Sequence, residues 1–252
     1  MNRISIFIIC KNEERIINSC LKQASKLADE IIIVDSGSTD LTLNICQRYT
    51  DKIYHQEWLG FGKQKNIALE NCSNEWVLSL DSDEILSDEL INEIKSLRLT
   101  LTPSSSEVSL NPNGFLIARK LFIGLDEVKH GGFYPDYQLR LFRKSKGRFC
   151  QSPVHESVEL KNHFGEFTKS RKGLPTLSNP LHHYAYDNLD KLEESFKKYA
   201  GLSLRKKNIR KAFTSALFTF VYKYFIRFGF LDGSLGLKLA FINSKYQFKK
   251  YF

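Results

Sequence analysis

The sequence predicts an α/β fold with a mostly parallel sheet flanked by helices, followed by a basic, aromatic helical extension. Short apolar runs rich in β-branched residues occur at Ile4–Ile9, Ile31–Val34 and Trp76–Leu80, and stretches of helical periodicity separate them. Continuous rather than alternating apolar runs are typical of strands that helices cover on both faces. This alternation of strands and helices predicts a right-handed, doubly wound sheet.

The segments between and after these runs complete the expected order of elements. Apolar side chains recur at helical spacing over the ranges 14–27, 40–49, 63–70 and 88–97. Ser38 to Asp40 can cap the second of these helices. Thr100–Asn113 is rich in Thr, Ser, Pro and Asn and is expected to be a loop. Gly114–Lys120 and Tyr137–Arg143 are expected to be strands, and Asn188–Ser203 a helix.

Charge is distributed unevenly along the 252 residues, which carry a formal net charge of +9. Residues 201–252 contain eleven Lys or Arg and one acidic residue, Asp232, so the first 200 residues are close to neutral. A basic tail on a neutral body suggests contact with an anionic surface. We therefore expect a catalytic domain over residues 1–187, with halves at 1–98 and 114–187, and a membrane-surface extension over 188–252.

The five cysteines are scattered and form no CxxC pair. We expect them to be small buried thiols in a reducing compartment rather than disulfides or metal ligands. The apolar stretch after Met1 runs directly into Lys11-Asn12-Glu13-Glu14, which is not the pattern of a signal peptide. These features favour a cytoplasmic location.

Three polar segments follow the three predicted strands: Lys11 to Glu14, Asp35 to Asp40, and Asp81 to Glu84. Each alone could be a turn or a helix cap. Together they fall at the carboxyl ends of neighbouring strands, where open α/β sheets bind their ligands. The helix starts at this edge add backbone N–H groups that suit a phosphate.

These residue types suit a nucleoside diphosphate. Such a leaving group needs a hard divalent cation, which takes oxygen ligands from one or two carboxylates. Asp81 and Asp83 point the same way along an extended segment and can share this task. Asp35 can accept a hydrogen bond from a nucleobase N–H. The sequence therefore predicts a site for a nucleotide with Mg²⁺ or Mn²⁺.

Residues 4–97 resemble the nucleotide-binding half of the family-2 inverting glycosyltransferases, which have the GT-A fold. The resemblance rests on Ile8 to Glu14, Glu30 to Asp40, and Asp81-Ser82-Asp83, which matches the DXD motif of that family. It implies that Asp83 is a metal ligand and that Asp81 contacts ribose or metal. It also implies a nucleotide pocket, whose expected residues are Lys11, Asn12, Glu13, Asp35, Ser36, Gly37, Asp81 and Ser82.

A narrower resemblance extends over most of the chain. Its segments are Trp58 to Asn66, Trp76 to Asp81, Tyr134-Pro135-Asp136, Arg140 to Arg143, His155-Glu156, His183-Tyr184 and Gly229 to Gly233. They resemble lipopolysaccharide core glycosyltransferases that add glucose in β-1,4 linkage to a heptose. This implies UDP-glucose as the donor and a lipid A-core saccharide as the acceptor. Another cell-envelope glycan remains an alternative acceptor.

Inversion requires a general base beside the acceptor hydroxyl, and a carboxylate suits this role. Glu156 is the first candidate, since its distance from Arg140–Arg143 resembles the placement of the catalytic acid of the family. Asp136 is the second, because it follows Gly131-Gly132 in a loop that could close over substrate. An ion pair or a turn would be the structural explanation for these two residues.

Further side chains have two explanations each. His155 and His183 are expected either as structural residues or as third metal ligands, and His183 is retained as the metal candidate. Lys63 and Lys65 near a helix start are candidates for phosphate binding, or they are solvated surface lysines. Trp58 and Phe61 are expected either to pack in the core or to stack on a sugar.

The apolar stretch Ala212–Leu231 is about long enough to span a bilayer, but it contains Lys223 and Arg227. Ser215, Thr219, Lys223 and Arg227 recur at every fourth position and form a polar stripe. A helix of this kind is expected to lie in the interface. The protein would then be peripheral on the inner face of the cytoplasmic membrane. The alternative of another class is a tail that binds nucleic acid. Under the favoured prediction, no nucleic acid is expected as a partner.

Overall fold

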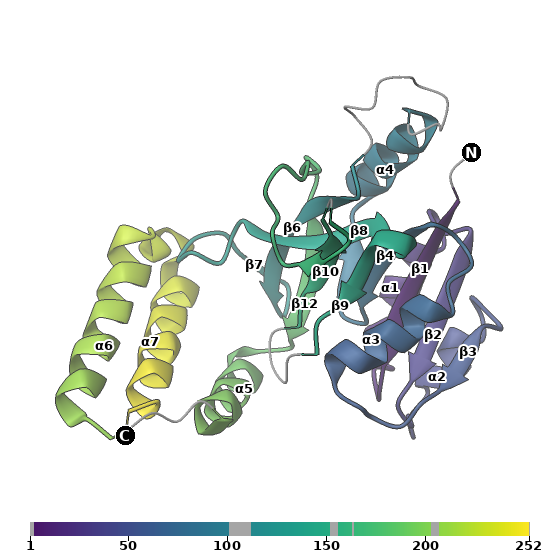
Figure 1. Ribbon diagram of the computed structural model, residues 1–252. Coiled ribbons are helices and arrows are strands. Elements are labelled where there is room, and N and C mark those ends of the chain that lie inside the picture. The colour runs from purple at the N-terminus through teal and green to yellow at the C-terminus, as the bar shows by residue number, and fades with distance from the viewer. Residues whose placement is uncertain (1–2, 101–111, 152–155, 163, 203–206, 252) are drawn as a thin grey trace. The chain divides into compact units, whose positions relative to one another are not determined.

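The computed structural model describes residues 3–100, 112–151, 156–162, 164–202 and 207–251 (Figure 1). The chain forms two compact units, and each contains two segments of the sequence. The first unit contains Met1–Ala118 and Tyr137–Leu181, and the second contains Arg119–Asp136 and His182–Phe252. All of the expected extension, residues 188–252, belongs to the second unit, together with residues 119–136 and 182–187.

The strands of the described residues form one nine-stranded sheet and one three-stranded sheet. The large sheet has the order β3-β2-β1-β4-β8-β6-β12-β5, with β7 paired to β6. Its first four strands are parallel neighbours, and β8 is antiparallel to β4. The strands are β1 (Ile4–Cys10), β2 (Glu30–Asp35), β3 (Ile53–His55), β4 (Trp76–Asp81), β5 (Glu84–Leu86), β6 (Gly114–Ile123), β7 (Asp126–Val128), β8 (Asp136–Arg143) and β12 (Leu181–Tyr186).

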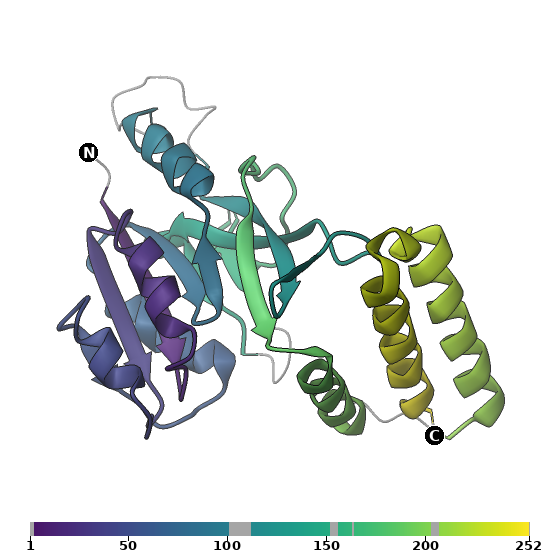
Figure 2. The same cartoon turned by 180° about the vertical axis from the view of Figure 1, so that it is seen from behind.

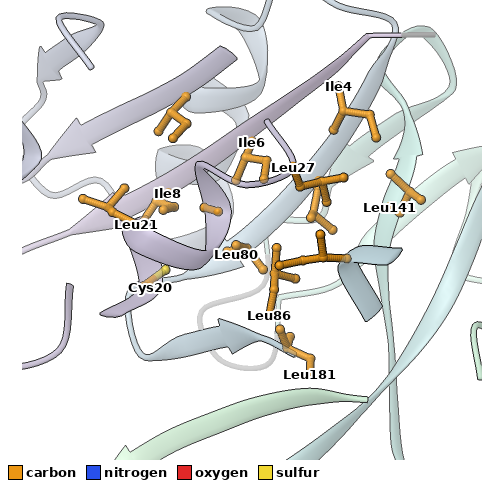
Figure 3. Packing of buried hydrophobic residues seen from close by; sticks show 14 of the residues in the cluster. Ile4, Ile6, Ile8, Cys20, Leu21, Leu27, Leu80, Leu86, Leu141 and Leu181 are labelled. Atoms are coloured by element: carbon orange, nitrogen blue, oxygen red, sulfur yellow. The ribbon is translucent and has the colours of Figure 1, made fainter. Parts of the chain in front are cut away.

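Helices cover both faces of the parallel strands, because alternate side chains of each strand are apolar on both sides. Ile6 and Ile8 of β1 face Cys20 and Leu21 of α1 (Ile17–Ala24), as Figure 3 shows. Phe7 lies on the other face of β1 with Ala68 and Leu69 of α3 (Phe61–Glu70). The predicted doubly wound α/β architecture is thus confirmed, with α2 (Thr42–Cys46) and α4 (Asp88–Thr100) on the α1 face.

The smaller sheet of the first unit contains β9 (Gly147–Phe149), β10 (Val158–Lys161) and β11 (Phe167–Thr168) in the order β11-β10-β9. A 3₁₀ turn, η2 (Lys144–Lys146), joins β8 to β9. Phe149, Val158 and Leu160 place this sheet against the α3 face of the core. The five cysteines are buried thiols, as the sequence predicted.

The second unit has its own apolar core, formed by Ile123 and Val128 with Leu192, Leu239 and Ile242. Its helical part comprises α5 (Leu189–Leu202), α6 (Ile209–Val221), the π-helical turn η3 (Tyr222–Ile226), the 3₁₀ turn η4 (Gly229–Asp232) and α7 (Gly233–Lys249). Helices α6 and α7 lie side by side as a hairpin, which Figures 1 and 2 show from opposite sides. No helix within the described residues is both long and apolar enough to cross a membrane.

Candidate active site

Two of the predicted carboxylates lie at the ends of strands that flank β1 in the sheet. In the register of the sheet, Asp35 at the end of β2 is opposite Cys10 of β1. Asp81 at the end of β4 is opposite Ile9 of β1. Neighbouring strands are about 4.8 Å apart, so Asp35 and Asp81 flank the end of β1, where Lys11 to Glu14 begins.

The loops after β1 and β2 are joined by hydrogen bonds from short polar side chains. The Asn12 N–H donates to Ser38 Oγ at 2.9 Å, and Asn12 Oδ1 accepts from the Thr39 N–H at 2.8 Å. The Glu13 N–H donates to Thr42 Oγ1 at 2.7 Å. Asn12 adopts a φ of 55°, a left-handed conformation that Asn tolerates better than most residues. These contacts fix the direction in which Glu13 leaves the sheet.

Asp35 is buried and accepts hydrogen bonds from its own loop. Its Oδ2 accepts from the N–H groups of Gly37 at 2.8 Å and Ser38 at 2.9 Å. Gly37 has a φ of 87°, which favours glycine. The neighbouring Ser36 Oγ accepts from Gln64 Nε2 at 2.9 Å, so α3 is tied to this loop. Asp35 therefore organises the turn on which the predicted nucleoside contact depends.

Glu13, Ser82 and Asp83 come together at the ends of β1 and β4. Burial, and then the negative charge of Asp83, raise the pKa of Glu13 to about 7, although a hydrogen bond with Ser82 opposes this shift. Negative charge is therefore concentrated at this edge of the sheet. A bound cation would relieve the repulsion.

Asp81 is held by two cations instead of standing open to solvent. Lys65 Nζ lies 2.7 Å from its Oδ1, and Arg140 Nη2 lies 2.6 Å from its Oδ2. Burial alone would raise the pKa of Asp81, but Arg140 and then Lys65 outweigh it and hold that pKa well below its usual range. Arg140 also pairs with the fully buried Glu84, which accepts from the Asp81 N–H at 3.0 Å.

The predicted base Glu156 joins this network through Lys65. The Lys65 ammonium lies 2.7 Å from Glu156 Oε1, as close as it lies to Asp81, and Lys65 is only 1% exposed. Lys65 thus connects two residues that the sequence analysis assigned to the donor and to the acceptor. Sequence reasoning gave Lys65 a phosphate contact, which stays a prediction. His155 lies outside the described residues.

Helix α3 also contacts Phe149 and Cys150, which precede Glu156 in the sequence. Asn66 Oδ1 accepts from the Phe149 N–H at 2.8 Å, and its Nδ2 donates to the Phe149 carbonyl at 2.9 Å. Gly62 lies so near that a Cβ there would be 2.2 Å from the Cys150 carbonyl oxygen. Gly62, Lys65 and Asn66 follow helical spacing, so one face of α3 contacts Phe149, Cys150 and Glu156.

Two of the remaining predicted side chains belong to the second unit. Asp136 is the first residue of β8, and Arg119 Nη2 lies 2.6 Å from its Oδ2. His183 is a half-buried residue of β12 in the same unit. Lys11 and Lys63 are exposed. Within the part of the chain that the structure describes, no three His, Cys, Asp or Glu residues form a metal-binding group.

Some contacts were not predicted from the sequence. Trp58 and Phe61 are 47% and 44% exposed, so they do not belong to the core, and their rings are in edge contact with centroids 4.7 Å apart.

Arg140 and Glu84 had no assigned role. A signal for Arg140 existed, because a charge within the apolar strand run Leu139–Phe142 must find a buried partner.

Comparison with known proteins relates this chain to glycosyltransferases. The family model described as Glycosyl transferase family 2 matches residues 5–97. A protein of Rickettsia bellii described as an uncharacterized glycosyltransferase is 31% identical over 245 residues, which cover 92% of this chain and 79% of that protein. The lipopolysaccharide core biosynthesis glycosyltransferase LpsC of Rhizobium meliloti is 36% identical over 174 residues, which cover 64% of this chain and 59% of LpsC.

Among solved structures, that of S. aureus TarS residues 1–349 in complex with UDP-GlcNAc aligns with a TM-score of 0.46 and 20% identity. The alignment covers 96% of this chain and 79% of that one. The family model includes all three loops at the carboxyl ends of β1, β2 and β4, and the Rickettsia relative extends over nearly all of the chain. From the family model, the Rickettsia relative and the topology of its sheet, the chain belongs to glycosyltransferase family 2 and has the GT-A type of α/β fold.

Proposed function

We propose that this enzyme transfers a hexose, with inversion, from a UDP-sugar to a lipid-linked saccharide at the inner face of the cytoplasmic membrane. UDP-glucose is the proposed donor, and a lipopolysaccharide core heptose is the proposed acceptor. The name of LpsC supports the acceptor class. The observation that carries the proposal is the edge of the sheet where Asp81 ends β4 beside the end of β1 and where Asp83 acts on Glu13.

The residues at this edge fit a divalent cation. Asp83 is the proposed principal ligand, as the match of Asp81-Ser82-Asp83 to the DXD motif implies. Asp81, which also forms ion pairs with Lys65 and Arg140, is proposed beside it. The negative charge of Asp83 raises the pKa of Glu13, and a cation between these carboxylates would reduce their repulsion. Mg²⁺ commonly takes one or two carboxylates and completes its shell with phosphate oxygens and water. A bound Mg²⁺ or Mn²⁺ would neutralise the charge that develops on the diphosphate leaving group.

Glu156 is the proposed general base. As the acceptor hydroxyl oxygen bonds to the anomeric carbon, the bond from that carbon to UDP breaks and the hydroxyl proton passes to Glu156. Lys65 fixes the direction of the Glu156 carboxylate at 2.7 Å. Asp136 is the alternative base, and its ion pair with Arg119 supports a structural role instead. His183 remains a proposed third contact for the cation or the diphosphate.

The test is a donor screen with purified enzyme and heptosylated lipid A acceptors, run with and without a chelator. Asp83→Asn should abolish metal-dependent transfer, while Asp51→Asn, an exposed carboxylate before β3, should match the wild type. Transfer that survives both the chelator and Asp83→Asn would contradict the cation site. Turnover only with acceptors that lack heptose would point to another cell-envelope glycan.

A second pair of variants identifies the base. Glu156→Gln should preserve UDP binding, measured by calorimetry, while it lowers kcat by about 100-fold or more. Asp136→Asn should leave kcat within a few fold of the wild type. If Asp136→Asn is inactive and Glu156→Gln is active, the roles of the two carboxylates are reversed.

A further inference from the structure

The outer face of helix α6 is apolar and exposed. Ile209, Phe213, Leu217 and Val221 follow one another at every fourth position, and all are exposed. Phe218 and Tyr222 form a second row beside them, which Ile226 extends into the turn η3. Phe213, Leu217 and Phe218 are between 62% and 66% exposed. Helix α6 alone extends for about 20 Å, so the two rows form a long apolar strip.

The inner face of the same helix is small and polar. Ala212 is fully buried, and Ser215, Ala216 and Thr219 are half-buried. Ser244 of α7 donates from its Oγ to the Ala216 carbonyl at 2.8 Å. Ser215 and Thr219 of the expected polar stripe therefore turn toward the protein along α6. The large apolar side chains of the two rows turn outward, and Phe220 is half-buried. A helix on a soluble protein has the reverse pattern.

The hairpin closes on small residues as well. Gly236 of α7 approaches the Gly229 carbonyl so closely that a Cβ would be 1.8 Å from its oxygen. Ala240, one turn further along α7, is also buried. Small residues between helices and large apolar residues outside are typical of helices packed within lipid. The pattern indicates that the outer face of α6 lies in an apolar environment.

Basic residues frame this strip. Lys207, Arg210 and Lys211 are exposed at the start of α6, and Arg227 is exposed beyond its end. No acidic residue occurs between positions 207 and 231. An apolar strip with positive ends complements an anionic lipid surface. It is a poor match for a second copy of itself, because each copy would bring only positive charges to the contact.

We propose that the outer face of α6 is the surface on which this enzyme docks on an anionic lipid bilayer. The helix lies in the interface with Phe213, Leu217 and Phe218 among the acyl chains and with Arg210 and Lys211 at the headgroups. The inference deepens the proposed function, since it names the surface that would meet the membrane. It concerns lipid binding alone, so it can be tested without a sugar donor.

The experiment measures flotation of the full chain with vesicles of phosphatidylglycerol and phosphatidylcholine, and with vesicles of phosphatidylcholine alone. The wild type should bind the anionic vesicles. The variant Phe213→Ser/Leu217→Ser/Phe218→Ser should bind them at least about tenfold more weakly. Leu125→Ser and Phe164→Ser are matched controls, because these side chains are exposed outside the strip, and they should bind like the wild type.

A second variant tests the charges. Lys207→Gln/Arg210→Gln/Lys211→Gln should lower affinity for the anionic vesicles by about 100-fold. Unchanged melting temperatures show that the exposed substitutions leave the fold intact. Equal flotation of the wild type and the triple Ser variant would overturn the proposal. So would light scattering that shows a dimer in the wild type and a monomer in the triple Ser variant, since the strip would then join two copies.

Discussion

Lys65 is the residue on which the network of the candidate site depends most. Its ammonium is enclosed and lies 2.7 Å from both Asp81 and Glu156. A buried ion pair adds little net stability compared with an apolar pair, but removal of one partner leaves an uncompensated buried charge. In this network, the loss of Lys65 removes the cation beside Glu156, while Asp81 keeps Arg140 as a partner.

We expect Lys65→Met to lower the free energy of unfolding by about 3 kcal/mol. Adding Glu156→Gln in the same chain should restore part of that loss, because the carboxylate that loses its Lys65 partner is then replaced by a neutral amide. Urea unfolding of the two single variants and the double variant measures this coupling. Lys63→Met, two residues earlier and exposed, is the control and should change stability by less than about 0.5 kcal/mol. Strictly additive effects would show that Lys65 and Glu156 do not interact.

Only part of the site could be predicted from residues. Asp35 and Asp81 end predicted strands, and parallel strands end at one edge, so their proximity follows from the sequence pattern. The contact between Lys65 and Glu156 joins positions 91 residues apart. No periodicity indicates it, because it depends on how α3 packs against the chain around β9. For the same reason, the sequence did not show that Asp81 forms ion pairs with both Lys65 and Arg140.

At the scale of elements, Glu30 fixes the start of β2 to its neighbours. Its Oε1 accepts from Lys52 Nζ at 2.6 Å and from Ser73 Oγ at 2.7 Å. Its Oε2 accepts from the Ser73 N–H at 2.8 Å and from Ser5 Oγ. Burial opposes ionisation, but the hydrogen bonds from Lys52, Ser5 and Ser73 prevail and lower the pKa of Glu30 to about 2.

The low pKa of Glu30 implies a stability that depends on pH. A carboxylate with a lowered pKa in the folded state stabilises the fold above its unfolded pKa of about 4.3, and this contribution disappears as the pH falls toward 2. We expect Glu30→Gln to cost about 1–3 kcal/mol at neutral pH. Urea unfolding between pH 7 and about pH 2 should show the difference shrinking. The exposed Glu70→Gln serves as the control, and a difference that stays constant with pH would contradict the assignment.

The longer elements followed from periodicity, and the short ones did not. The runs at Ile4–Ile9 and Trp76–Leu80 became β1 and β4 within one residue at each end. Strands of two to four residues, such as β9 and β11, are too short to show a period. The expected helix from Ala212 to Leu231 is α-helical to Val221 and π-helical to Ile226, and Phe228 then adopts a φ of 58° in the turn before α7. Close packing of Gly229 and Gly236 favours this turn.

At the scale of the whole molecule, the excess of positive charge comes from residues 201–252, which contain eleven basic residues and one acidic residue. The acidic one, Asp232, accepts from the N–H groups of Lys129 and His130, so it does not screen the exposed cations of α6. The second unit therefore carries a net positive charge. Its attraction to an anionic surface should act over about 10 Å at moderate ionic strength.

We expect binding of the full chain to phosphatidylglycerol-containing vesicles to weaken steeply when the ionic strength is raised several-fold. Screening weakens the attraction of Lys and Arg to the headgroups but leaves the apolar contact in place. Flotation over a salt series measures this dependence, with phosphatidylcholine vesicles as the control series. Binding to the anionic vesicles that is insensitive to salt would show that the basic residues do not contribute.

The close approach of α3 to the chain after β9 has a consequence for mutational scans of this enzyme. The backbone at Gly62 leaves room for a hydrogen atom only, since a methyl group would overlap the Cys150 carbonyl. A larger residue at position 62 would push that segment outward and move Glu156 with it. In a scan for activity, Gly62 would therefore rank with the reacting residues although it meets no substrate. A parallel scan for abundance would separate the two classes, because Gly62 substitutions would lower abundance and Glu156→Gln would preserve it.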